Sequence, residues 1–353
     1  MPMSQDSLCS RDGEIINNWY IACLSIDLKN KPIQRIIYDQ KFVLYRDAQG
    51  LPVAHLDRCP HRGTPLSKGH CHNGKLQCSY HGWTFSENGE VSNIPSEGQR
   101  GCKVKRFIHS FKTVEKDGVI WLWPTMSAPS ETISIWNFPY KNHPEWTSYY
   151  MVTDFDNEVT NLVENFVDVP HTVWVHKDWF RNQSYKEVPT TVVTSKGRVL
   201  VTYEQPEDNI GVFIKPILNP KNEPMSHTDE FIYPNITNVT YSFGKNFQYV
   251  INSQCSPIST FKTRVYTHIA YKLPLFGRLI KPFLNFYTRR VINQDVKIMS
   301  HQGENLKNEK NPRFQSTEAD EPHIQIEFLR KIGKTDQQKV YSVEKNKNIS
   351  FYI

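Results

Sequence analysis

The 353-residue sequence has no uninterrupted apolar run long enough to cross a membrane. A spanning helix needs about 20 consecutive apolar residues, so no spanning membrane segment is expected. The stretch 1–13 is polar and lacks the apolar core of a secretory signal, which predicts a cytoplasmic chain. No G-x-G-x-x-G sequence marks a strand–helix junction. A redox function would therefore need its reducing equivalents from a separate protein.

Cysteine is scarce, and its count of seven is odd. In a chain without a secretory signal, that count argues against a disulfide framework and favours reduced thiols or a metal site. The length suggests about two domains and is ample to bury a core. Aromatic residues make up 12% of the chain, which excludes a disordered protein.

Acidic residues are slightly outnumbered, with 36 against 42 basic residues and a net charge of +6. The two signs are interspersed, but lysines gather mainly toward the C-terminus. A solvated basic tail is therefore expected to explain the surplus, and no nucleic-acid partner is predicted. An acidic redox partner is a further hypothesis for the same surplus, and electron delivery that ignores salt would count against it.

The first part of the chain, 15–125, consists of short β-branched and aromatic segments separated by turn residues. Asn88-Gly89 and Asp117-Gly118 are strong hairpin signals. Short strands at this spacing predict a small all-β domain. A stretch rich in Pro, Ser and Thr, 124–132, predicts a linker after it.

The second part, 126–335, changes character and predicts a larger α+β domain. Apolar spacing predicts helices over 157–167 and 283–307. Alternating segments between 190 and 271 predict an antiparallel sheet. The remaining stretches are expected to be an N-terminal segment, 1–14, and a polar C-terminal tail, 336–353.

Two short segments each place a cysteine and a histidine next to a glycine: 59–64, CPHRGT, and 78–83, CSYHGW. The ligand candidates are Cys59, His61, Cys78 and His81. Two thiolates can hold one iron of a [2Fe–2S] cluster, and two imidazoles can hold the other. The glycines let the loops turn tightly and bring backbone N–H groups toward the sulfurs.

A Cys₂His₂ zinc site is the competing interpretation. Zinc spacings keep like ligands together, whereas each segment here mixes cysteine with histidine. The two motifs resemble those of the Rieske family over about residues 15–125. The resemblance implies a Rieske [2Fe–2S] cluster on the four candidate residues. Thr64 and Tyr80 stand where respiratory Rieske proteins carry extra cysteines, which implies the disulfide-free type used in oxygenases and their ferredoxins.

The five other cysteines show no partner pattern and are interpreted as incidental thiols. They are Cys9, Cys23, Cys71, Cys102 and Cys255. His70 and His72 flank Cys71, and all three are interpreted as surface loop residues.

A second cluster of metal-ligand types follows the predicted helix over 157–167. Asp168, His171 and His176 lie within nine residues. Two histidines and a carboxylate form the facial triad that binds non-haem Fe(II) and leaves positions open for O₂. On an unbroken helix the two histidines would point apart, so the segment must bend to bring them together. A helix with incidental histidines is the alternative.

The pattern D-x-x-H-x-x-x-x-H after a Rieske domain resembles the catalytic domain of Rieske non-haem iron oxygenases. The resemblance implies that His171 and His176 are iron ligands. It implies that Asp168 is a hydrogen-bonded bridge from the iron ligand to His81 of a neighbouring chain. The third ligand of the family corresponds to Asp295, in the apolar setting of the predicted helix over 283–307. An unpaired carboxylate there would be costly.

The resemblance as a whole implies a terminal oxygenase of the compact monooxygenase and demethylase branch. Its expected fold is an all-β Rieske domain followed by a helix-grip, START-like domain with an antiparallel sheet flanked by helices. Its expected cofactors are the [2Fe–2S] Rieske cluster and a mononuclear Fe(II). Its expected partners are a reductase or ferredoxin, O₂, a small hydrophobic or cyclic organic substrate, and two further copies in a homotrimer.

Other reactions and one other class of protein stay open at this point. The same iron site supports ring dioxygenation, desaturation and oxidative cyclisation. A Rieske electron-transfer protein without oxygenase activity would keep only the cluster. Iron analysis distinguishes the two classes, because the oxygenase holds one more iron per chain.

Overall fold

A computed structural model describes most of the chain and divides it into two compact units, Met1–Asn137 and Phe138–Ile353. The described ranges are 14–100, 106–177, 179, 185–204, 215–244, 247–273, 277–309 and 312–353. Cys9, Cys102 and the stretch 1–13 of the predicted N-terminal segment lie outside these ranges. None of the helices in the described part is long and apolar enough to span a bilayer.

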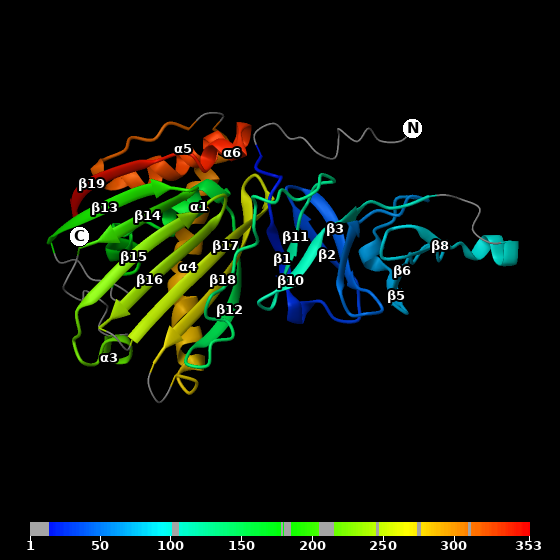
Figure 1. The fold of residues 1–353 in the computed structure, drawn as a ribbon, viewed down its shortest axis with the longest axis horizontal. Helices are drawn as coiled ribbons and strands as arrows, with labels where there is room; N and C mark the ends of the chain where they lie inside the picture. Colours follow the sequence, from blue (N-terminus) through cyan, green and yellow to red (C-terminus); the bar gives the residue numbers. More distant parts are fainter. Residues whose placement is uncertain are drawn as a thin grey trace. The chain divides into compact units, whose positions relative to one another are not determined.

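The first unit is built from short antiparallel strands, as its hairpin signals predict (Figure 1). They form three small sheets, in the orders β1-β11-β10, β2-β3-β4-β9 and β5-β6-β7-β8. The strands are β1 Tyr20–Leu24, β2 Ile33–Ile37, β3 Gln40–Arg46, β4 Pro52–Leu56, β5 His70–His72, β6 Lys75–Gln77, β7 Thr84–Phe85, β8 Val91–Asn93, β9 Ser110–Phe111, β10 Thr113–Lys116 and β11 Val119–Leu122.

Two apolar clusters hold this unit together. One packs β1, β2, β3 and β11 around Phe42, whose ring meets Phe111 edge-on at 4.8 Å. The other gathers Leu66, Leu76 and Phe85 directly beneath the two cysteine-histidine segments. The segments are therefore anchored on a packed core, although they are loops themselves.

The second unit contains one antiparallel sheet of eight strands, in the order β12-β18-β17-β16-β15-β14-β13-β19. Its strands are β12 Thr147–Phe155, β13 Glu187–Ser195, β14 Arg198–Tyr203, β15 Met225–Ile232, β16 Ile236–Phe243, β17 Phe247–Ser259, β18 Lys262–Lys272 and β19 Lys345–Tyr352. The helices are α1 Val159–Asn165, α2 Thr172–Val175, α3 Lys215–Leu218, α4 Lys281–Leu306, α5 Glu321–Thr335 and α6 Gln337–Val340.

The long helix α4 crosses one face of this sheet (Figure 1). Pro282 stands in its first turn, where a missing N–H costs nothing. Leu284 and Tyr287 pack into an apolar cluster with residues of β12, β16, β17 and β18. Gly303 lets the helix approach β12 closely, because an added Cβ would stand 2.1 Å from the carbonyl oxygen of Asp156. The predicted α+β class, with an antiparallel sheet flanked by helices, is confirmed.

The segment expected to be a polar C-terminal tail is instead part of the fold. Strand β19 pairs with β13 along its whole length, from Lys345 to Tyr352. Ile349 and Phe351 are buried at alternate positions, and the surrounding Lys and Asn residues mask this period-two pattern in the sequence. Lys345 and Lys347 each bind the buried Glu321 at the start of α5, at 2.6 Å.

Replacing Glu321 by glutamine should lower the Tm by about 4–8 °C at neutral pH, because two ion pairs worth about 2 kcal/mol together are lost. Burial opposes ionisation of Glu321, but the two lysines outweigh it and lower its pKa to about 2. A lowered carboxyl pKa stabilises the fold above about pH 5, and this stabilisation disappears as the pH falls toward 2.

Thermal unfolding of the parent protein and of Glu321→Gln at pH 7 and pH 3 checks this prediction. The difference between their Tm values should be smaller at pH 3. The control is Glu318→Gln, an exposed carboxyl in the turn before α5. Equal Tm values at pH 7 for the Glu321 variant and the parent would contradict the assignment.

Candidate active site

The two cysteine-histidine segments adopt the same backbone conformation. The N–H of Cys59 donates to the carbonyl of Thr64 at 2.9 Å, and the N–H of Gly63 donates back to Cys59 at 2.8 Å. In the second segment the N–H of Cys78 donates to the carbonyl of Trp83 at 2.9 Å, and the N–H of Gly82 donates to the carbonyl of Cys78 at 3.1 Å. Both glycines have positive φ, +75° and +71°, which explains why glycine stands there. The predicted pair of matched loops is present.

The side chains of these loops separate into a buried pair and a more exposed pair. Cys59 and Cys78 are 2% and 3% exposed, and neither forms a disulfide. The rings of His61 and His81 lie 4.5 Å apart, and His81 reaches the surface. Trp83 stacks on the His61 ring at 4.8 Å and fixes its plane. Two thiols on the inner side and two imidazoles on the outer side fit a [2Fe–2S] cluster between them.

An unpartnered imidazole nitrogen and a buried thiol support that fit. The Nδ1 atom of His61 is buried and has no hydrogen-bond partner, so it offers a lone pair that a metal would satisfy. Burial raises the pKa of the Cys59 thiol to about 11, a cost that a metal removes because a coordinated thiol is deprotonated. The surface loop expected over His70, Cys71 and His72 is instead the short strand β5, and Cys71 packs against the apolar cluster beneath the ligand loops.

The second cluster of ligand types is assembled from two breaks in helical structure. Helix α1 ends at Asn165, and α2 begins only after Pro170 and His171. Helix α2 in turn ends at Val175, so His176 leaves the helix with φ −106° and ψ 24°. The required bend between the two histidines is therefore present. Asp295 approaches from the middle of α4 and is 7% exposed.

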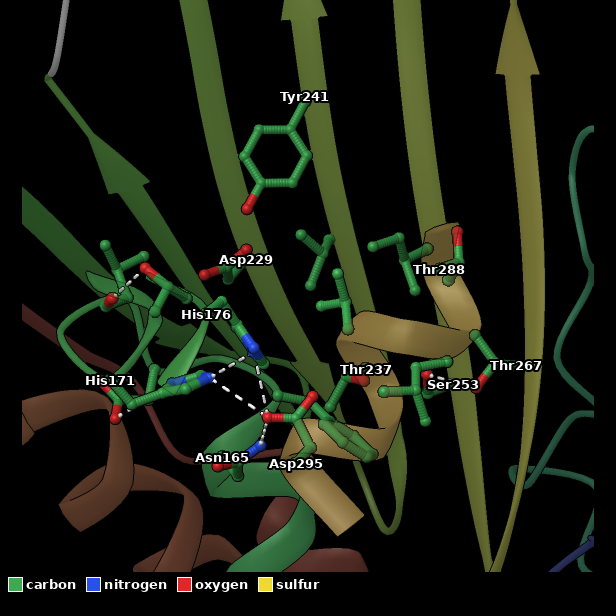
Figure 2. A pocket seen from close by; sticks show the side chains of 18 of the residues that line it. Asn165, His171, His176, Asp229, Thr237, Tyr241, Ser253, Thr267, Thr288 and Asp295 are labelled. Carbon is green, nitrogen blue, oxygen red and sulfur yellow. Dashed lines mark hydrogen bonds and ion pairs between the residues drawn. The ribbon is translucent and has the colours of Figure 1, made fainter. Parts of the chain in front are cut away.

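Three donor atoms converge at this point (Figure 2). Nε2 of His176 lies 3.1 Å from Oδ1 of Asp295, and Nε2 of His171 lies 3.6 Å from the same oxygen. The two Nε2 atoms are 3.3 Å apart. Ligands that share one face of an octahedral ion at about 2.1 Å are about 3.0 Å from each other. The arrangement fits a mononuclear iron with one face left open.

The charge states of Asp295, His171 and His176 depend strongly on one another. Burial favours the neutral form of Asp295, but His171 and His176 outweigh it and hold its pKa well below the usual range. Burial likewise disfavours a charged His171, yet Asp168 and Asp295 raise its pKa above the usual range. A proton and a metal cation therefore compete for the same donor set.

Asp168 contacts the cluster from the side of His171. Its Oδ2 lies 3.4 Å from Nδ1 of His171, within ion-pair distance but without hydrogen-bond alignment. The Asp168 side chain is 20% exposed, so it reaches both the histidine and the surroundings of the unit. This position suits a group that orients His171.

Three supporting residues have no signal in the sequence that could have identified their roles. Gln294 faces Nδ1 of His176 at 3.0 Å and so turns Nε2 toward the other donor atoms. Asn157 donates to the Met299 carbonyl at 2.8 Å and ties the start of α1 to α4. Asn165 approaches Oδ1 of Asp295 at 3.4 Å. Each of the three contacts joins residues more than a hundred positions apart, so no local sequence pattern predicts it.

Replacing Gln294 by leucine should weaken mononuclear iron binding by ~10–100-fold, the usual cost of removing a hydrogen bond behind a ligating histidine. Iron titration of the metal-free protein checks this. The control is Asn293→Leu, because Asn293 is the exposed neighbour on the same helix. Unchanged iron affinity in the Gln294 variant would show that His176 is held by packing alone.

A cavity of about 120 Å³ opens beside the three donor atoms. It lies between α1, α4 and the sheet, and most of its wall surface is apolar, although polar side chains from these elements also line it. An engineered cavity of about 150 Å³ holds benzene, so this one accepts roughly one ring. A cavity with mostly apolar wall surface beside three possible metal ligands would allow a small organic molecule to lie next to a bound metal.

Comparisons with known proteins agree with both parts of the chain. Residues 18–113 match the Rieske [2Fe-2S] domain, and residues 155–332 match the vanillate O-demethylase oxygenase C-terminal domain. The oxygenase component of dicamba O-demethylase from Stenotrophomonas maltophilia is 32% identical over 59% of this chain and 61% of its own length.

The vanillate O-demethylase oxygenase subunit from Pseudomonas sp. (strain HR199 / DSM 7063) is 31% identical over 51% of this chain and 52% of its own length. The matched stretches thus span little more than half of these relatives. A crystal structure of dicamba monooxygenase bound to dicamba superimposes with a TM-score of 0.78, covering 91% of this chain and 98% of that chain at 21% identity. That likeness concerns the fold.

Proposed function

Because the chain belongs to the Rieske oxygenases with a vanillate O-demethylase-type C-terminal domain, we propose that it is the terminal oxygenase component of a multi-component system. Its reaction is hydroxylation or demethylation of a small, hydrophobic or cyclic organic molecule. The observation that carries this proposal is the convergence of His171, His176 and Asp295 beside a cavity with mostly apolar wall surface.

The cofactors divide the chemistry between the two units. When bound, the Rieske cluster would pass on single electrons from a separate reductase or ferredoxin, and the mononuclear iron would activate O₂. Cys59, Cys78, His61 and His81 hold the cluster in this proposal. His171, His176 and Asp295 hold the mononuclear iron. The protein itself binds the substrate, excludes water and fixes the ligand orientations.

Asp168 has a positioning role in this proposal. Its carboxylate orients His171 from one side, as the 3.4 Å contact supports. We propose that its exposed side meets His81 of the partner subunit in a homotrimer. The carboxylate then links the two metal sites and holds a proton whose position follows the redox state of the cluster. The free cysteines fit the reducing conditions of the cytoplasm, which we propose as the compartment.

A reconstituted assay tests the proposed function. The chain, a reductase and O₂ are incubated with a metabolite extract, and products heavier by an oxygen or lighter by a methyl group are sought by mass spectrometry. Reduction of the cluster without any oxygen-dependent product, in a protein with a filled mononuclear site, would favour the electron-transfer alternative.

A further inference from the structure

The cavity contains one charged side chain that does not belong to the proposed iron site, and it is Asp229 on β15. The other charged or titratable lining residues in the described part of the chain are Asp168, His171, His176, Asp295 and Tyr241. Neither lysine nor arginine lines the cavity among the residues that the structure describes. A ligand in this cavity would therefore meet the Asp229 carboxylate, with neither lysine nor arginine among the described lining residues to balance its charge.

Asp229 is held firmly in place from behind. It is 2% exposed, and its Oδ2 accepts a hydrogen bond from the Tyr203 hydroxyl at 2.9 Å. Nε2 of His227 lies 2.8 Å from Oδ1. A carboxylate oxygen only accepts, so Nε2 carries the proton. Burial raises the pKa of Tyr203, so its hydroxyl keeps its proton and remains a donor.

A stack of rings locks these donors. The His227 ring stacks on Tyr203 at 4.6 Å and on Tyr241 at 4.2 Å, with interplanar angles of 23° and 15°. Asp229 and Tyr241 line the cavity, whereas His227 and Tyr203 do not. Figure 2 shows Asp229 between Tyr241 and His176, with the Tyr241 hydroxyl directed toward it. Asp229 and Tyr241 are thus the members of this rigid group that a ligand would meet, and Asp229 is the charged one.

We propose that Asp229 selects the substrate by charge: the cavity takes a neutral or cationic cyclic molecule with a hydrogen-bond donor, and it rejects an aromatic acid. Two carboxylates about 4 Å apart inside a protein repel strongly. A carboxylate offers about four lone-pair positions, and Tyr203 and His227 occupy two of them. A substrate O–H or N–H would use a remaining one.

This inference rests on the proposed function, since it assigns the substrate class of the same cavity. It also separates this chain from one of its relatives. Vanillate, the molecule named in the matched O-demethylase, is a carboxylate. Under our proposal, this chain would discriminate against such a molecule although the family and the fold are shared.

Binding of matched ligands tests the proposal without catalysis. One set is para-methoxybenzyl alcohol, para-methoxybenzylamine and para-methoxybenzoate, which share ring and methoxy group but differ in charge. Calorimetric titration of the iron-loaded protein, kept oxidised and free of O₂, gives their affinities. We expect the benzoate to bind at least ~10-fold more weakly than the alcohol. The amine should bind at least as tightly as the alcohol.

Asp229→Asn keeps the shape of the side chain and removes its charge. The affinities for the benzoate and the alcohol should therefore become similar, so that their ratio moves toward one. The control is Glu230→Gln, the next residue on β15, whose carboxylate pairs with Arg198 and does not line the cavity. That control should leave the ratio unchanged. If Asp229→Asn does not fold, the affinities of the unaltered protein for the benzoate and the alcohol still test the proposed charge selection.

Three results would overturn the proposal: a benzoate that binds as tightly as the alcohol, a ratio that Asp229→Asn leaves unaltered, or no binding by any member of the set. These outcomes are separate from the proposed function. Binding needs neither electrons nor O₂, so a protein without oxygenase activity can still show the expected order. An active oxygenase with the reverse order would overturn only the charge selection.

Discussion

Replacing His171 by alanine is expected to empty the mononuclear iron site and to reduce product formation by more than ~100-fold. Loss of a hydrogen bond behind a ligating residue already lowers metal affinity or activity by ~10–100-fold. His171 supplies a donor atom itself, 3.3 Å from that of His176, so its loss should cost more. The cluster should survive, because its loops lie on the separate apolar core of the first unit. Iron analysis, visible absorption and product formation measure the three effects.

The control for this variant is His301→Ala. His301 is an exposed histidine of α4 and lines no part of the cavity. It should keep full iron content and full turnover. A His171 variant that retains its mononuclear iron and its activity would contradict the ligand assignment.

Replacing Asp168 by asparagine should have the second-largest effect while leaving both metal sites filled. The substitution preserves shape but removes the charge that faces Nδ1 of His171 at 3.4 Å. We expect electron transfer from the cluster to the mononuclear iron to slow by ~10–100-fold, as for other residues that orient a ligating histidine. Stopped-flow absorption of a pre-reduced, substrate-bound protein mixed with O₂ follows the cluster directly.

The chain offers a matched control for Asp168. Asp320 and His323 form a second aspartate–histidine pair of the same spacing, at 3.6 Å and outside the cavity. Asp320→Asn should therefore leave cluster reoxidation unchanged. Reoxidation at the parental rate in Asp168→Asn would remove the proposed link, and loss of iron from that variant would assign Asp168 to metal retention.

The local sequence is sufficient to predict those parts of the site that lie within a few consecutive residues. The ligand loops close within six residues, so CPHRGT and CSYHGW are enough to predict their turns, and the structure contains both turns. Helix α4 follows from its apolar spacing, but the choice of Asp295 on it depended on a resemblance. No local rule connects that aspartate with histidines more than a hundred residues earlier.

What the sequence could not predict depends on tertiary contacts. Strand β15 has polar residues on its buried face, including His227 and Asp229, so it lacks the alternation of apolar and polar residues that marks a strand. Strand β19 hides Ile349 and Phe351 among lysines and asparagines. The support of His176 by Gln294 joins residues 118 apart in sequence. Such pairings arise only after the sheet and α4 have assembled.

The ratio of iron to acid-labile sulfide tests the central claim most directly, because it needs no substrate. A [2Fe–2S] cluster with a mononuclear site predicts three irons for two sulfides in each fully loaded chain. The third iron should disappear in His171→Ala while the sulfide content stays the same. Two irons for two sulfides in the unaltered protein, after loading with excess Fe(II), would contradict the account and leave an electron carrier.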